Sequence, residues 1–385
     1  MKAPILRSVR VRNFKAVHDS GVLKLTPLTV LIGNNGSGKS SVVEALETLR
    51  TAVVEDIDGA MQMWRGIEHV RNKSRQRQTR FDETGAERSS KPIGFEIRGH
   101  TGDRTFVAKT AINERGAGNE LFIEEESVRY GDVASHRDAG NRVETRHGNR
   151  SASRDRCPPG TSILGKYIGD YVRGWQLLSL WPGSMGDPSP QTRTRGPVRL
   201  ARDGRNLAEY LLDIRKRDLS VFEGIVDTLK FVLPYAADIQ PALTSELERA
   251  VYLQMAERDF KVPGWLLSTG TLRILALLAG LRHPAPPSLI IVEEVENGLD
   301  PRTIHLLVDE IREAVHAGRQ VIATTHSPYL LDLLPLSSIV LCDRDDAGDA
   351  VFFRPADDKE KSAWAKSFGP GQLYTMSRLS RRAGE

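Results

Sequence analysis

Cysteine is nearly absent from this chain of 385 residues, which contains only Cys157 and Cys342. Two cysteines so far apart lack metal-ligand spacing, which argues against a zinc ribbon or a disulfide-rich secreted domain. Long apolar runs are also missing, because the most apolar stretch, 272–281, is short and contains Arg273. Arginines interrupt the N-terminal segment, so we expect no secretory signal. These absences favour a cytoplasmic protein with two free thiols.

An excess of one charge sign is missing as well. The chain has 54 Lys and Arg against 50 Asp and Glu, a net charge of +4. This balance permits nucleic-acid binding without requiring it. The chain also shows no internal repeat and no sustained heptads, so we expect no long coiled-coil arm. Two basic stretches could contact phosphates or could be solvated surface: 65–80, and Arg193, Arg195, Arg199, Arg202 and Arg205.

The first half of the chain is predicted to be rich in strands. The apolar run 28–32 is typical of a strand buried on both faces, and a helix is expected at 40–54. Segments 93–98, 105–112 and 120–124 alternate in polarity and predict an antiparallel sheet. The polar segment 131–161 predicts a surface loop or a disordered insertion. Shorter strands are expected at 5–12 and 22–25.

Helices and buried strands alternate in the last third, which predicts an α/β fold with a parallel sheet. The expected domains are an N-terminal lobe (1–126), a flexible basic insertion (127–202), a helical lobe (203–282) and a C-terminal lobe (283–385). Within them we expect helices at 203–233, 271–281, 302–316 and 328–333, strands at 289–292, 320–324, 339–342 and 350–354, and a helical tail at 377–382.

A glycine-rich segment follows the predicted strand 28–32 and matches the pattern G-x-x-x-x-G-K-[ST] of a P-loop. Glycines let the backbone curl so that successive amides face phosphate oxygens, and the following helix directs its positive end at the same anions. Lys39 can reach the β- and γ-phosphates, and Ser40 can ligate Mg²⁺. The predicted ATP-binding residues are Gly33, Asn34, Asn35, Gly36, Ser37, Gly38, Lys39, Ser40 and Ser41.

Two acids, Glu293 and Glu294, follow the predicted strand 289–292. Ligands of α/β proteins bind at this edge of the sheet, where one carboxylate can hold Mg²⁺ and another can orient or deprotonate water. Taken alone, the pair could be an ordinary strand end. His326 follows the strand 320–324, where it is either structural or close to the γ-phosphate.

The order of these motifs resembles the ATPase heads of the ABC type, and within them the soluble RecF/SMC/Rad50-like branch that includes OLD-family and antiphage ATPases. The resemblance includes Leu267-Ser268-Thr269-Gly270-Thr271, Asn297-Gly298-Leu299-Asp300-Pro301, Thr325-His326-Ser327-Pro328 and the opening Val11-Arg12-Asn13-Phe14-Lys15. It covers about 1–55 and 203–355. It implies an α/β P-loop ATPase head with a mixed or parallel sheet core, an antiparallel β lobe and a helical lobe.

The resemblance implies roles for residues at matching positions. Gly33 to Ser40 would be Walker A, Glu293 would hold Mg²⁺ with Ser40, Glu294 would be the catalytic base, and His326 would be the switch histidine. Ser268 and Gly270 in the signature motif, and Asp300 in the D-loop, would contact ATP bound by an opposite subunit. The sequence departs from the family at Glu293, where Asp is usual, and at Thr269 and Thr271 in the signature. No Q-loop glutamine is evident, since Gln62 is more typical of a surface helix.

An ATP-dependent homodimer follows from the resemblance, with ATP and Mg²⁺ as cofactors. Three uses of such a cycle remain open: a switch or motor on DNA in repair or antiphage defence, a scaffold that assembles a separate effector or nuclease subunit with little turnover, and the ATPase of a transporter. The large middle segment argues against the transporter. Asp343, Asp345 and Asp346 are interpreted as a polar turn, so we expect no nuclease domain on this chain.

Overall fold

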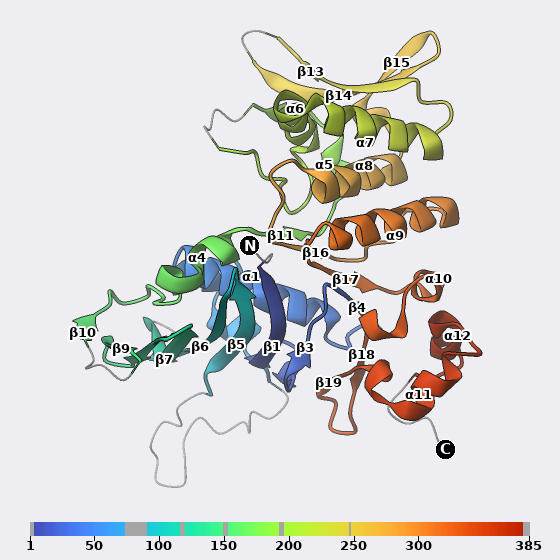
Figure 1. Ribbon diagram of the computed structural model, residues 1–385. Coiled ribbons are helices and arrows are strands. Elements are labelled where there is room, and N and C mark those ends of the chain that lie inside the picture. Colours follow the sequence, from blue (N-terminus) through green and yellow to red (C-terminus); the bar gives the residue numbers. More distant parts are fainter. Residues whose placement is uncertain are drawn as a thin grey trace. The chain divides into compact units, whose positions relative to one another are not determined.

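The computed structural model describes residues 4–73, 91–115, 120–148, 153–191, 196–245 and 248–379. The chain forms two compact units (Figure 1). The first comprises Met1–Trp175, Ser337–Ala363 and Ser377–Glu385, and the second comprises Gln176–Leu336 and Trp364–Met376. Across the described ranges, no helix combines the length and the apolar character needed to cross a membrane.

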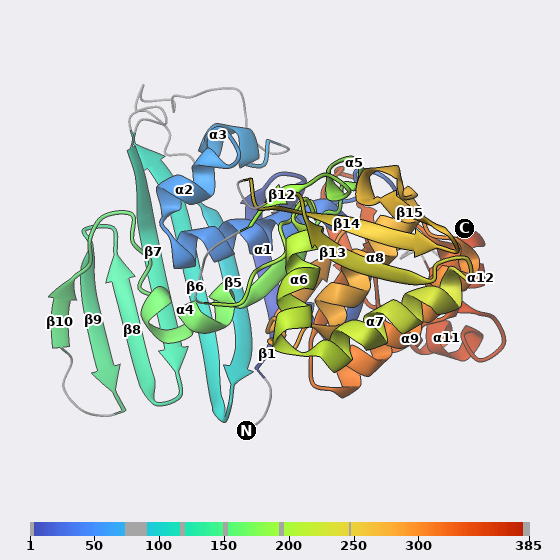
Figure 2. The same cartoon turned by 90° about the horizontal axis from the view of Figure 1, so that it is seen from above.

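A nine-stranded antiparallel sheet dominates the first unit (Figure 2). Its order is β10-β9-β8-β7-β6-β5-β1-β2, with β3 also paired to β1. Helices α1, α2 and α4 lie on one face of this sheet, over a core that includes Val9, Val11 and Phe95. The bounds are β1 (Ile5–Phe14), β2 (Val17–Asp19), β3 (Leu23–Lys24), β5 (Ile93–Thr101), β6 (Arg104–Arg115), β7 (Glu120–Tyr130), β8 (Val133–Asp138), β9 (Arg142–His147), β10 (Ser153–Arg156), α1 (Lys39–Val54), α2 (Ile57–Gln62), α3 (Ile67–Val70) and α4 (Gly165–Arg173).

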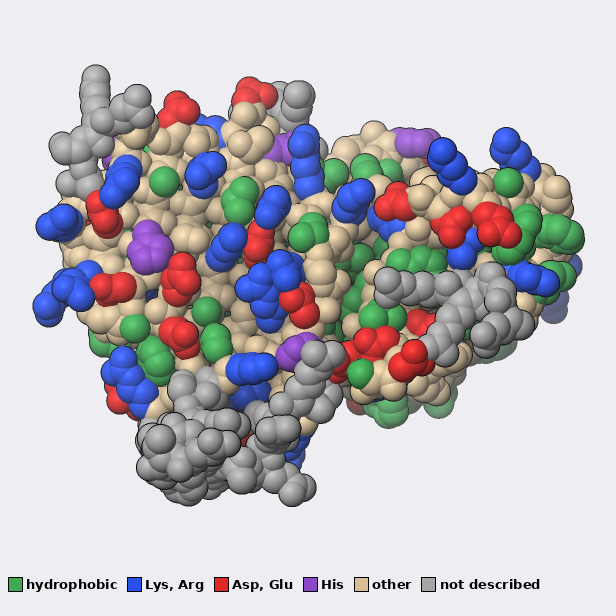
Figure 3. All heavy atoms as spheres, turned by 90° about the horizontal axis from the view of Figure 1, so that it is seen from below, with side chains coloured by type: hydrophobic (Ala, Val, Ile, Leu, Met, Phe, Trp, Pro, Cys, Tyr) green, Lys and Arg blue, Asp and Glu red, His purple; other side chains and the backbone are tan. Residues whose placement is uncertain are grey.

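The opposite face of this sheet carries charged side chains of both signs (Figure 3). Several are paired: Arg10 and Arg12 both lie near Asp19, and Arg98 and Lys109 both contact Glu96. Exposed ion pairs of this kind contribute little to stability. The face is therefore a solvated surface with local charge pairing.

The prediction of a loop or disordered insertion at 131–161 is wrong, because β8, β9 and β10 lie there and extend the antiparallel sheet. The inward-facing residues of these strands are polar: Ser135, Arg137 and Thr145 are buried. Arg137 donates to the Pro158 carbonyl and to other main-chain and side-chain oxygens, so its charge is compensated inside the fold. A strand whose buried face is polar lacks the apolar alternation by which strands are recognised.

The first unit also contains three further strands, one directly before the P-loop turn in the sequence and two much later in the chain. β4 (Leu28–Ile32) is buried at every residue and pairs in parallel with β18 (Ile339–Arg344). β18 forms an antiparallel hairpin with β19 (Ala350–Phe353). Because β18 continues past the end of β4, its last residues flank the loop that follows β4.

In the second unit, β16 (Leu289–Val292) pairs in parallel with β17 (Val321–Thr325), and β11 (Trp175–Leu178) lies on the other side of β16. Helices α8 (Thr269–Arg282) and α9 (Pro301–His316) pack next to each other, and α10 (Pro328–Asp332) contacts α12 (Pro370–Thr375). A small antiparallel sheet packs on α6 and α7. The other elements are α5 (Pro182–Met185), β12 (Ser189–Pro190), α6 (Leu207–Arg217), α7 (Leu219–Val232), β13 (Asp238–Leu243), β14 (Ala250–Glu257) and β15 (Phe260–Pro263), and α11 (Lys359–Trp364) crosses between the units in sequence.

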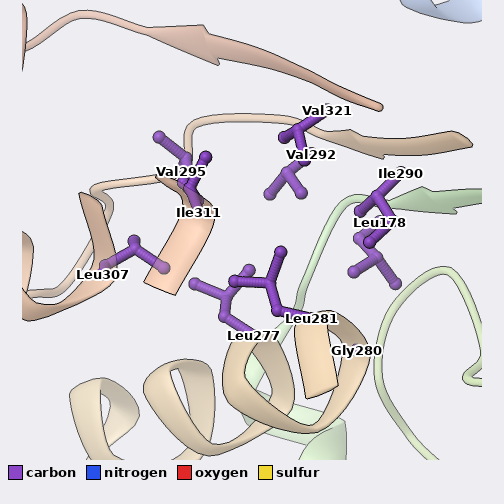
Figure 4. Close-up of a pocket in the computed structure, with 10 residues that line it drawn as sticks. All are labelled: Leu178, Leu277, Gly280, Leu281, Ile290, Val292, Val295, Leu307, Ile311 and Val321. Carbon is purple, nitrogen blue, oxygen red and sulfur yellow. The ribbon is translucent and has the colours of Figure 1, made fainter. Parts of the chain in front are cut away.

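Helix α8 packs its apolar side chains against β11, β16 and α9 around a small cavity of about 10 Å³ (Figure 4). Leu277 and Leu281 face it from α8, and Ile290 and Val292 face it from β16. A space of this size is at the lower limit for one water molecule, and its lining is apolar. It is therefore a packing defect, and its lining shows that α8 packs directly against β16, the strand that Glu293 follows.

Candidate functional site

The P-loop turn begins where β4 ends and closes at the start of α1. Gly33 lies against β18, since a Cβ at this position would clash with the Cys342 carbonyl oxygen. Gly36 and Gly38 have φ of 75° and 100°, which L side chains rarely adopt. Gly38 is the N-cap of α1, a helix of 16 residues. Glycine is thus required at three points of the turn, for one close approach and two left-handed backbone conformations.

The side chains of this turn are arranged for an anion. Lys39 is buried, and its Nζ donates to the carbonyls of Gly33 (2.7 Å) and Asn34 (3.0 Å). Ser37 Oγ is buried and has no hydrogen-bond partner among the described residues. Ser40 is exposed in the first turn of α1. The helix N-terminus, one buried ammonium group and one orphaned hydroxyl make this turn suitable for phosphate oxygens.

Arg344 also holds this turn, a role that no motif in the sequence indicated. Its Nε (2.9 Å) and Nη2 (2.6 Å) both donate to the carbonyl of Gly36. Its Nη1 donates to the carbonyl of Gly348 in the β18–β19 turn (2.5 Å). One guanidinium therefore ties the tip of the P-loop turn to a hairpin more than 300 residues later in the chain.

In the second unit, Glu293 follows β16 at the edge where β11 also ends. Its main-chain N–H donates to the Leu178 carbonyl at 2.9 Å, which fixes it beside β11. Its side chain is mostly buried and pairs with Arg202, whose Nη2 lies 3.1 Å from Glu293 Oε2. An arginine that was a candidate for phosphate contact is thus the counter-ion of a candidate Mg²⁺ ligand.

Glu294 has a left-handed backbone, with φ of 47°. A non-glycine residue in this region is strained and persists only when neighbours hold it. Its N–H donates to Thr324 Oγ1 at 2.8 Å, and its carbonyl accepts from Arg273 Nη2 at 2.7 Å. Its carboxylate is exposed and accepts from Asn297 Nδ2 at 3.2 Å. The backbone is held at both ends while the acid itself faces outward.

His326 lies one residue after β17 and is exposed. Its main-chain N–H donates to Glu296 Oε1 at 2.7 Å, so the segment after β16 is bonded to the segment after β17. Asp300 caps α9 by accepting from the N–H groups of Arg302 and Thr303. The hydrogen bond from the Thr303 hydroxyl holds the pKa of Asp300 below its usual value. Asp300 therefore has a structural role as a helix cap in addition to the D-loop role predicted for it.

The signature segment opens α8. Ser268 is its N-cap and accepts from the Thr271 N–H at 3.1 Å. A Cβ on Gly270 would lie 2.6 Å from the carbonyl oxygen of Gly298, so the helix start touches the D-loop segment directly. The structure thus brings the signature segment, the D-loop segment, Glu294 and His326 together in the second unit, while the P-loop belongs to the first.

The remaining expectations concern Gln62 and the basic stretches. Gln62 is exposed at the end of α2, consistent with a surface helix residue. Of the stretch 65–80, Arg71 is buried and bonded to Asn113 and Glu114, so it is not part of a solvated basic surface and its charge is already paired within the fold. Residues 74–90 lie outside the described residues, as do Arg193 and Arg195. Arg205 is paired with Asp203, and Arg199 is exposed.

Comparison with known proteins adds a family and a fold. Residues 28–332 match the family described as "AAA domain, putative AbiEii toxin, Type IV TA system". "OLD nuclease" of Thermus scotoductus is 22% identical over 370 residues, which are 93% of this chain and 66% of the relative. "Nod factor export ATP-binding protein I" of Sinorhizobium fredii is 37% identical over 87 residues, 22% of this chain and 25% of that protein. The chain spans less than two thirds of either relative.

Solved structures of SMC heads are similar in fold. An SmcHead bound to the C-winged helix domain of ScpA has a TM-score of 0.50 and 14% identity, covering 91% of this chain and 97% of that one. An Smc head domain with an extended coiled coil, bound to the C-terminal domain of ScpA derived from Pyrococcus furiosus, has a TM-score of 0.54 and 11% identity, covering 94% and 99%. At these identities the likeness establishes the P-loop ATPase fold.

Proposed function

Because the chain belongs to the family described as "AAA domain, putative AbiEii toxin, Type IV TA system", we propose that it binds ATP at Gly33–Ser41 and hydrolyses it with Glu294 as base. It is an ATPase of the RecF/SMC/OLD-like class. The observation that carries the proposal is the curled turn at the start of α1, with Gly36 and Gly38 in left-handed conformations and Lys39 buried beneath it.

In the proposed binding mode, Lys39 exchanges its bonds to the Gly33 and Asn34 carbonyls for phosphate oxygens. Ser37 Oγ gains the acceptor that it lacks among the described residues. The amides of the first turn of α1 face the same anion, where the helix dipole favours negative charge. The energy of ATP binding comes mainly from this turn, so loss of the Lys39 charge should weaken binding strongly.

We propose Mg²⁺ as the cofactor, because the hydroxyl of Ser40 and the carboxylate of Glu293 are the hard oxygen ligands that Mg²⁺ prefers. Ser40 would hold the ion through its hydroxyl and Glu293 through its carboxylate, and the bound ion would neutralise charge on the phosphates. Glu293 must then exchange its ion pair with Arg202 for the metal. The exposed carboxylate of Glu294 would accept a proton from the attacking water, and His326 would donate to the γ-phosphate.

We further propose that a second copy of the chain completes the site. Ser268, Gly270 and Asp300 would approach ATP bound by that copy, as the resemblance to ABC-type heads implies. The support is local: Ser268 and Thr269 are exposed at the start of α8, whose N-terminus favours an anion. ATP would then join two heads, and hydrolysis would release them.

For the biological role we propose a switch or motor in a DNA-related process such as antiphage defence or repair. The names of the family and of the OLD nuclease relative support it. The alternative is an ATP-dependent scaffold that assembles a separate effector, such as a nuclease subunit, with little turnover. The rate of ATP hydrolysis with and without DNA separates the two, because a DNA-coupled motor should be stimulated and a scaffold should not.

Two variants test the ATPase proposal. Lys39→Ala should lose ATP binding, measured by titration calorimetry. Glu294→Gln should bind ATP with normal affinity and hydrolyse it at least about a hundredfold more slowly, as expected for loss of a general base. Glu313→Gln is the matched control, because Glu313 is exposed in the last turn of α9, at the opposite end of the helix from Asp300. Turnover by Glu294→Gln at the wild-type rate would show that Glu294 is not the base.

A further inference from the structure

Helix α8 contains a charged residue, Arg273, at a position that is surrounded by buried apolar side chains. Arg273 has only 3% of its surface exposed and lies among buried leucines, alanines and isoleucine of the same helix. Burial lowers the pKa of its guanidinium from the usual value. Burying an arginine is unfavourable unless its donors are bonded, and an apolar side chain would fill the space without that penalty. The bonds made by Arg273 should therefore explain why an arginine stands here.

Those bonds join two chain segments that follow neighbouring strands. Nη1 donates to the carbonyl of Leu180, two residues after β11, at 2.8 Å. Nη2 donates to the carbonyl of Glu294, two residues after β16, at 2.7 Å. The side chain passes close to Gly298 on its way. Arg273 thus connects the signature helix with both segments at the edge of the sheet.

The second bond bears on the strain at Glu294. Its φ of 47° is unfavourable for a side chain with a Cβ, so the conformation depends on what holds the flanking peptide groups. Thr324 Oγ1 accepts from the N–H of Glu294, and Arg273 donates to its carbonyl. The same peptide is also held by the Asn297 N–H, which donates to the Glu294 carbonyl at 3.0 Å, and by its own Val295 N–H, which donates to the Thr324 carbonyl at 3.1 Å. Arg273 supplies the charge-assisted bond of the three, so without the guanidinium only the two neutral bonds remain and the backbone of Glu294 is held less firmly.

We propose that Arg273 is a positioning residue for ATP hydrolysis, which fixes the backbone of Glu294 and ties it to the helix that begins at Ser268. This inference rests on the proposed function, in which Glu294 is the base. Arg273 lies five residues after Ser268, less than two turns along one rigid helix. A shift of the signature end of α8 is therefore passed to the backbone of Glu294. Contact of Ser268 with ATP and correct placement of the Glu294 carboxylate would therefore occur together.

The test separates placement of the base from ATP binding. Arg273→Met keeps the length and apolar packing of the side chain and removes both donors. We expect kcat to fall by about a hundredfold, because small misplacements of a reacting group have effects of this size. The dissociation constant for ATP, measured by calorimetry, should stay within about twofold of wild type, because Arg273 bonds no residue of the P-loop turn. Arg273→Lys keeps one donor group and should give an intermediate kcat.

Arg282→Met is the matched control. Arg282 lies in the same helix and also donates to a main-chain carbonyl, that of Gly224, while pairing with Glu310. Its loss should lower the midpoint of thermal unfolding and leave kcat unchanged. If Arg273→Met also changes only the unfolding midpoint, Arg273 is structural and the proposal is wrong. If Arg273→Met does not fold, the kcat of Arg273→Lys decides: a wild-type value would overturn the proposal.

A double variant tests whether Arg273 acts through Glu294. In the Glu294→Gln background, Arg273→Met should cause no further loss of the residual hydrolysis, because the carboxylate that it places is already gone. An equal further loss would show that Arg273 acts elsewhere. Glu294→Gln alone tests the proposed function, because wild-type turnover by that variant would show that Glu294 is not the base. If Glu294→Gln is inactive and Arg273→Met is fully active, only the positioning role of Arg273 is overturned.

Discussion

In each of the two units, an arginine side chain that donates to a main-chain carbonyl holds a candidate functional segment. Arg273 bonds the carbonyl of Glu294, and Arg344 bonds the carbonyl of Gly36. The planar guanidinium suits this task because it offers several donors in fixed directions and stays charged at all relevant pH values. In each case the residue that is held has a positive φ, 47° at Glu294 and 75° at Gly36. The arginines therefore stabilise backbone conformations that the local sequence would not adopt by itself.

A prediction follows for Arg344. Its replacement by Ala removes two donors from the Gly36 carbonyl, so the peptide at the tip of the P-loop turn gains freedom that ATP binding must then remove. We expect the dissociation constant for ATP to rise about tenfold, equivalent to about 1.4 kcal/mol, in the range of a charge-assisted hydrogen bond. The maximal rate at saturating ATP should change little.

Arg354→Ala is the control for Arg344→Ala. Arg354 follows β19, at the opposite end of the same hairpin, and donates to the carbonyls of Lys24 and Ser337. Its removal should reduce the free energy of unfolding without affecting ATP affinity. Equal ATP affinities for Arg344→Ala and wild type, measured by calorimetry, would show that the turn holds its shape without Arg344.

At the scale of elements, the strands that carry the motifs could be predicted from the sequence. The polar strands and the arginines that hold the motifs in place could not. β4 and β16 are buried at every residue, so their uninterrupted apolar runs gave their bounds directly. The P-loop pattern and the two acids then placed candidate residues at the ends of those strands. β8 and β9 were missed because Arg137 and Thr145 face inward. The sequence contains one indication of the role of Arg273, because it is a charged residue inside an apolar helix. Arg344 could not be identified in this way, because the residue that it bonds, Gly36, lies 308 positions away in the sequence.

The packing of α8 leads to a prediction about stability. Gly280 lines the small cavity beneath β16, and a Cβ there would meet only Leu178 Cδ1, at 3.7 Å. Glycine inside a helix is unfavourable relative to alanine by about 0.5–1 kcal/mol. Gly280→Ala should therefore raise the free energy of unfolding by about 1 kcal/mol, measured by urea denaturation, because the methyl group also fills empty space. A lower free energy of unfolding would mean that the added methyl group does not fit beside Leu178.

At the scale of the whole molecule, the two sets of candidate residues belong to different compact units. The P-loop turn lies in the first unit, and the acids, His326 and the signature segment lie in the second. A ligand that bonds to residues of both units stabilises whichever arrangement of them it binds. The proposed ATP-dependent dimer adds a second copy to the same principle.

The dimer can be tested with a variant that binds ATP without consuming it. Glu294→Gln with ATP and Mg²⁺ should form dimers, detected by sedimentation velocity, and the dimers should be absent with ADP because the γ-phosphate is missing. Adding Ser268→Arg should abolish dimers and leave the ATP affinity of the monomer unchanged, because Ser268 is proposed to contact only the ATP bound by the other copy. Ser220→Arg is the control, since Ser220 is exposed near the start of α7. Dimers that persist in Ser268→Arg would place the contact on another surface, and dimers that form equally with ADP would show that the γ-phosphate does not join the subunits.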